Sequence, residues 1–101
     1  MNNQLQIELK EDVAQGTYAN LAVITHSSSE FIVDFVRVMP GMPKASVKSR
    51  IVLAPEHAKR LLRALEENIG KYERTFGSIR LLDEQSIPPM TNLKGLSLIH
   101  I

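Results

Sequence analysis

A histidine followed by three serines is the first combination in this chain whose side chains could do chemistry. His26 directly precedes Ser27, Ser28 and Ser29, and a serine activated by a histidine base is a common nucleophile. Neighbouring residues of a strand point to opposite faces, however, so adjacency in sequence does not pair a base with its nucleophile. No oxyanion-hole motif accompanies them. We therefore interpret the segment as a polar hairpin turn and expect no catalytic residue in it.

The histidines are also candidates for metal ligands. His26 and His57 have the carboxylates of Glu30 and Glu56 near them in sequence, but these spacings match no known ligand pattern. The chain of 101 residues contains no cysteine, which excludes disulfides and thiolate ligands. We expect neither a metal nor a cofactor, and we predict that the protein is not an enzyme.

Charged side chains inside apolar segments are the next candidates for a functional site. Asp34 lies within the apolar stretch 31–39, and a charge in such a strand is costly unless it is paired or solvated. Neighbouring strands would bring basic side chains close to it. We predict cross-strand ion pairs or an exposed recognition surface at these positions. The candidate residues are Asp34, Arg37, Lys48 and Arg50.

Basic residues form two groups that could contact phosphates, one near the last predicted strand and one in the helix that follows. They are Lys44, Lys48, Arg50, Lys59, Arg60 and Arg63. Binding to nucleic acid would require that they converge on one surface, and its affinity would fall steeply with salt. The formal net charge is only +1, which gives no global attraction to nucleic acid, membranes or acidic substrates. Association with nucleic acid is the alternative function.

Four predicted strands must position these residues. Residues 3–9 alternate between apolar and polar side chains, which is typical of a half-buried strand. Residues 18–26, 31–39 and 45–53 are further strands, and the first of these is apolar on both faces. The connections are short, and the Pro-Gly-Met-Pro segment at 40–43 is a strong breaker. Short connections favour an antiparallel meander.

A helix is predicted to start at Pro55, a residue that is favoured at the first helical position, and to end before Gly77. Ala54 precedes it and is a poor cap. Apolar residues recur along the helix at alternating intervals of three and four, which is typical of a coiled-coil seam. The predicted oligomer seam consists of Leu62, Leu65, Ile69, Tyr72 and Phe76.

The length of the chain limits it to a single domain, which we place at 1–82, followed by an irregular tail at 83–95. The last six residues, 96–101, read Leu-Ser-Leu-Ile-His-Ile. This peptide corresponds in translation to the end of a transposase-based sequencing adapter, so we predict that it is not native. The N-terminus has no apolar run like that of a signal peptide, and no stretch approaches a membrane span. We expect a cytoplasmic protein without a membrane partner.

Three sequence words occur in order along the predicted strands and helix. They are Tyr-Ala-Asn at 18–20, His-Ser-Ser-Ser-Glu-Phe at 26–31 and Pro-Glu-His-Ala-Lys-Arg-Leu-Leu-Arg-Ala-Leu at 55–65. Together with the Pro-Gly loop they resemble a small bacterial and archaeal family catalogued as domain of unknown function 3467. The resemblance covers residues 16–77 and departs at Ala54, where a hydroxyl cap is expected. The family has no established activity, so the resemblance implies a fold and no function.

The expected fold is α+β, with an antiparallel meander of three or four strands followed by one long C-terminal helix packed on the sheet. One helix cannot cover both faces of such a sheet, and a domain of about 75 residues buries only about 60% of its unfolded surface. We therefore expect a homo-oligomer, most simply a dimer. The predicted function is a small non-enzymatic protein-interaction module, which could also accept another protein or peptide by strand addition.

Overall fold

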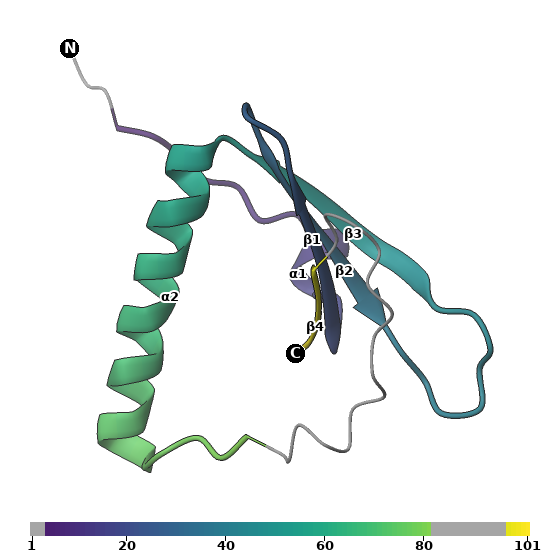
Figure 1. The fold of residues 1–101 in the computed structure, drawn as a ribbon. Coiled ribbons are helices and arrows are strands. Elements are labelled where there is room, and N and C mark those ends of the chain that lie inside the picture. Colours follow the sequence, from purple (N-terminus) through teal and green to yellow (C-terminus); the bar gives the residue numbers. More distant parts are fainter. Residues whose placement is uncertain (1–3, 82–96) are drawn as a thin grey trace.

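The computed structural model describes residues 4–81 and 97–101. Its elements are α1 (Glu11–Ala14), β1 (Leu21–His26), β2 (Phe31–Arg37), β3 (Ser46–Leu53), α2 (Pro55–Phe76) and β4 (Ser97–His100) (Figure 1). The strands form one antiparallel sheet in the order β3-β2-β1-β4. The predicted α+β class, with a meander of three consecutive strands followed by a C-terminal helix, is confirmed.

The serine segment makes the turn between β1 and β2. The Ser27 N–H donates to the Glu30 carbonyl at 2.9 Å, and the Ser27 hydroxyl accepts from the Ser29 and Glu30 N–H groups at 3.2 and 3.3 Å. Local bonds of this kind are the reason that serine favours turns. The hairpin brings His26 opposite Phe31, and their rings stack with centroids 5.4 Å apart.

Asn20 fastens the other end of the same strand pair. Its side-chain Nδ2 donates to the Val38 carbonyl at 3.0 Å, and its Oδ1 accepts from the Val38 N–H at 2.7 Å. Its backbone N–H donates to the Val36 carbonyl at 3.1 Å. The Asn20 amide therefore continues the hydrogen-bonded ladder beyond the last residue of β2.

The predicted N-terminal strand at 3–9 is wrong for the residues that the structure describes. Residues 4–10 have no regular structure, and Leu5, Ile7 and Leu9 are exposed. Alternating side chains form a strand only where a neighbouring edge supplies hydrogen bonds, and the edge of β1 is taken by β4. The fourth strand of the sheet is thus β4. The short helix α1 follows this segment at Glu11–Ala14.

The register between β2 and β3 contains one irregularity. Phe35 lies opposite Ser49, whereas Val36 lies opposite Val47, so Lys48 is an extra residue of β3. Such a β-bulge shifts the following side chains to the other face of the sheet. Val47 therefore shares a face with Val36 and not with Ser49, although simple alternation along the strand would place Val47 and Ser49 on one face.

The helix α2 has the predicted bounds but does not lie across the sheet. In Figure 1 it stands beside the strands, and none of its residues is buried. Only Ala54 connects β3 to α2, which leaves no loop to turn the helix back over the sheet. The buried apolar side chains of the described residues are those of Ala22 and Val36. The single chain thus leaves most of its apolar surface uncovered.

The start of α2 offers a test of local stability. Ala54 occupies the N-cap position with φ −63° and ψ 151°, and no side chain caps the helix. Replacing Ala54 with serine or aspartate supplies an acceptor for a free N–H of the first turn, so we expect a gain of about 1 kcal/mol in the free energy of unfolding. Urea denaturation measures it. Ala54→Val is the control and is expected to give no gain.

Two predictions concern the C-terminal region. The irregular tail at 83–95 lies outside the described residues. Within the predicted non-native segment, Ser97–His100 form β4, and the proposal that residues 96–101 are foreign to the native protein stays a prediction.

Candidate interaction surfaces

Asp34 and Arg50 form a two-pronged ion pair across β2 and β3. The Arg50 Nε donates to Asp34 Oδ1 at 2.7 Å and Nη2 donates to Oδ2 at 2.9 Å. The two residues are direct partners in the strand register, and Val23 of β1 lies beside Asp34 on the same face. The Asp34 side chain is only 10% exposed, whereas that of Arg50 is 62% exposed. The pair therefore holds a nearly buried carboxylate on one face of the sheet.

This ion pair makes stability depend on pH. The hydrogen bonds from Arg50 lower the pKa of the Asp34 carboxyl; burial opposes the shift, and the Arg50 charge lowers the pKa further. A folded-state pKa below the unfolded value of about 3.9 means that the unfolded chain takes up the proton first on acidification. The stabilisation is thus complete above the unfolded pKa and is lost as the pH falls through the lowered folded value.

We therefore expect the free energy of unfolding to fall on acidification below about pH 5. Urea denaturation at pH 7, 5 and 3 measures this slope. The Asp34→Asn variant has no proton to take up at this position, so its slope below pH 5 should be shallower. An identical slope in the two proteins would show that other carboxylates set the acid sensitivity.

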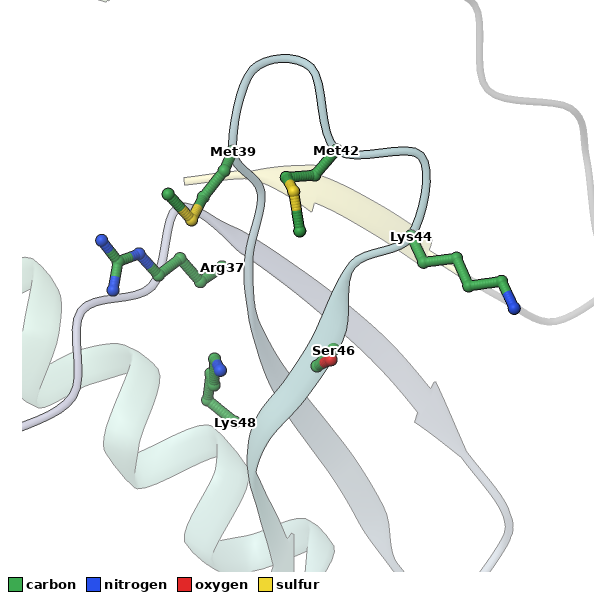
Figure 2. Close-up of a pocket in the computed structure, with 6 residues that line it drawn as sticks. All are labelled: Arg37, Met39, Met42, Lys44, Ser46 and Lys48. Atoms are coloured by element: carbon green, nitrogen blue, oxygen red, sulfur yellow. The ribbon is translucent and has the colours of Figure 1, made fainter.

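The other two candidate residues of the strands, Arg37 and Lys48, line a shallow hollow at the loop between β2 and β3. Its lining residues are Arg37, Met39, Met42, Lys44, Ser46 and Lys48, and its volume is about 110 Å³. In Figure 2, Lys44 extends away from the hollow on the side opposite Arg37. The three cations come from the end of β2, the loop and β3, and they do not converge on one point.

The apolar seam of α2 is an exposed candidate surface. We use this name for Leu62, Leu65, Ile69, Tyr72 and Phe76, whose exposed fractions run from 39% for Ile69 to 73% for Phe76. The rings of Tyr72 and Phe76 are in contact, with centroids 4.9 Å apart. On the opposite face of α2, the i,i+4 pairs Glu56–Arg60 and Glu67–Lys71 satisfy charges within the helix. α2 thus carries an apolar stripe on one face and paired charges on the opposite face.

One face of the sheet also carries an apolar hollow. It is lined by Thr17, Ala19, Phe35, Ser49 and Ile51 and has a volume of about 300 Å³. Phe35 and Ser49 are register partners, and Ile51 lies two residues further along β3 on the same face. The hollow therefore lies on the sheet face opposite the Asp34–Arg50 pair.

The residues that suggested catalysis or metal binding are placed apart. His26 stacks on Phe31, and the Ser27 hydroxyl is engaged in the turn. His57 lies in the first turn of α2, on a different element. Within residues 4–81 and 97–101, no group of three histidine, cysteine, aspartate or glutamate side chains could hold a metal ion.

Sequence reasoning missed Asn20, Met39 and Met42. Asn20 is the last residue of the Tyr-Ala-Asn word, and a short amide at the start of a strand is a signal for a bond to a neighbouring backbone. The methionines flank the Pro-Gly turn, where two flexible apolar side chains between cations indicate an adaptable contact surface. Both signals can be read from the sequence, but only the structure shows that Asn20 bonds to Val38.

The comparisons with known proteins identify a family and add no function. No curated protein and no solved structure matches the chain significantly. Among the described residues, no helix is long and apolar enough to cross a membrane. A family model described as "Protein of unknown function (DUF3467)" matches residues 1–81, which include the three sequence words, the meander and all of α2. The chain belongs to this family.

Proposed function

We propose that the protein is a homo-oligomeric protein-interaction module in which the α2 seam packs on the same seam of a second copy. The exposure of that seam is the observation that carries the proposal. Burying a large apolar side chain stabilises by about 1.5–3 kcal/mol relative to leaving it in water. Five such residues in one stripe on a single helix form a contiguous patch of the kind that marks an interface.

A second copy suits this stripe better than the chain's own sheet. The intervals of three and four residues between seam positions are those of helices that pack on each other. In an antiparallel pair, the Glu56 end of one helix lies beside the Arg74 end of the other, which places opposite charges together. The helix dipoles are then also opposed. A twofold arrangement uses the same surface on both copies.

Light scattering after size-exclusion chromatography, over a range of concentrations, tests the proposal. We expect twice the mass of the chain, and a shift towards the mass of one chain on dilution. A protein that stays at the mass of one chain at every concentration would contradict it. We further propose a cytoplasmic location, because a chain without cysteine needs no oxidising compartment.

The loop between β2 and β3 favours nucleic-acid association as a second candidate function. Arg37, Lys44 and Lys48 line the hollow at this loop and no carboxylate does, whereas Arg50 and Arg60 are held in ion pairs. Cations spread along a loop suit an extended polyanion better than a small anion.

A labelled single-stranded oligonucleotide tests this candidate by fluorescence anisotropy. If it binds at the loop, its affinity falls linearly with salt on a logarithmic scale. Lys48→Glu then weakens binding, whereas Arg63→Glu, the same charge change on α2, weakens it less. Equal effects of the two variants would place the binding elsewhere.

A further inference from the structure

The two outer strands of the β3-β2-β1 meander differ in how they are protected against pairing. The β3 edge carries Lys48 and Arg50, and it contains the bulge at Lys48. Charges and bulges on an edge strand prevent another strand from adding to it. β1 reads Leu-Ala-Val-Ile-Thr-His, with no lysine, carboxylate, proline or bulge. The sheet is therefore built to be extended on the β1 side only.

The structure shows what kind of segment fits this edge. β4 pairs antiparallel with β1, with Ala22 opposite Ile99 and Ile24 opposite Ser97. The pairing continues past β4, because the Ile101 N–H donates to the Asn20 carbonyl at 2.8 Å. The bound segment is short, extended and uncharged. It is held by main-chain groups, which any extended segment can supply.

We infer that the β1 edge is a strand-acceptance site for a short, extended, uncharged and largely apolar segment of a partner protein, with residues 97–101 as its occupant here. The inference rests on the proposed role as an interaction module and names one surface of it. Main-chain hydrogen bonds supply the affinity in such strand addition, and alternate side chains supply the specificity. Segments with charges on alternate positions would meet apolar neighbours on β1 and are excluded.

Successive N–H groups along an antiparallel strand point alternately toward and away from the neighbouring strand, and this alternation allows a variant that displaces β4 from the site. Since Ile101 donates to β1, the N–H of Ile99 also faces β1, whereas the N–H of His100 faces away. Proline has no N–H, so Ile99→Pro removes a ladder bond and His100→Pro does not. The two variants introduce proline at neighbouring positions of the full chain.

The probe is the fluorescently labelled peptide Leu-Ser-Leu-Ile-His-Ile, and the readout is anisotropy. A tethered strand competes at an effective concentration of about a millimolar, so the wild-type edge should resist the free peptide. We expect saturable binding to Ile99→Pro that is at least about tenfold tighter than binding to His100→Pro. A peptide N-methylated at its isoleucine before histidine should not bind, whereas one N-methylated at the histidine should.

Equal binding of the peptide to both variants, or no binding to Ile99→Pro with its circular dichroism unchanged, would overturn the inference. So would Ile99→Pro reaching twice the mass of the wild-type assembly without binding peptide, because the occupant would then be a second copy. The N-methylated peptides keep the test independent of the variants' folding. Adding Leu65→Glu to Ile99→Pro separates the two proposals. Conversion to single chains supports the seam, and an unchanged mass contradicts it. Peptide binding that persists in the double variant supports the edge site in either case.

Discussion

Leu65→Glu is expected to dissociate the proposed oligomer into single chains. Leu65 lies in the middle of the α2 seam and is 55% exposed in the single chain, so the substitution costs the isolated chain little. In a helix pair, the same position would bury a carboxylate without a partner, which costs several kcal/mol. Light scattering should report the mass of one chain at concentrations where the unmodified protein is associated.

Arg63→Glu provides the matched control for this prediction. Arg63 is two positions before Leu65, which places it on nearly the opposite side of the helix. It introduces the same carboxylate with the same helix propensity, and we expect it to leave the mass unchanged. Dissociation by Arg63→Glu and not by Leu65→Glu would mean that another face of α2 forms the contact.

Breaking the Asp34–Arg50 pair on one side is expected to destabilise the protein more than removing both partners. Arg50→Met leaves the carboxylate of Asp34, which is 10% exposed, without its two donors. A nearly buried charge that loses its partner is strongly destabilising, whereas an apolar replacement of both partners is often neutral or stabilising. The double variant Asp34→Leu with Arg50→Met should therefore be more stable than Arg50→Met alone.

Urea denaturation at pH 7 measures this cycle, with a midpoint for each protein. We expect the urea midpoint of Arg50→Met to be lower than that of the double variant. Lys71→Met serves as control, since its partner Glu67 is exposed and the pair lies on the helix surface at 3.5 Å. It should shift the midpoint only slightly. A double variant less stable than Arg50→Met would show that the ion pair is not replaceable by apolar contact.

The sequence predicted the meander and α2 well because their signals are local. A proline at the first helical position, a glycine after the last one and regular apolar spacing fix the bounds of α2. The serine turn likewise fixes the β1–β2 hairpin. The predicted N-terminal strand at 3–9 was wrong because the alternation of its side chains does not show whether a sheet edge is free to pair with it. Whether α2 packs on the sheet depends on the single residue between β3 and α2, which no periodicity reveals.

The candidate site was predicted in part. Asp34 and Arg50 were among four charged positions, and the strand register selects them as the pair while it leaves Arg37 and Lys48 at the loop. The bulge at Lys48 made this choice, because one extra residue changes which side chains share a face. The exposed seam of α2 followed from spacing alone. The β1 edge could not be predicted from spacing, because the order of the strands in the sheet decides which strand lies at an edge.

The amide of Asn20 has a consequence for the reach of the loop that follows β2. It acts as a spare peptide group, offering one donor and one acceptor to Val38 where the strand itself has ended. These bonds hold the chain at Val38, which is two residues beyond Val36, the last residue of β2 that pairs with β1. The cationic loop therefore leaves the sheet at Val38, so an asparagine that directly precedes the first residue of β1 determines where this loop begins.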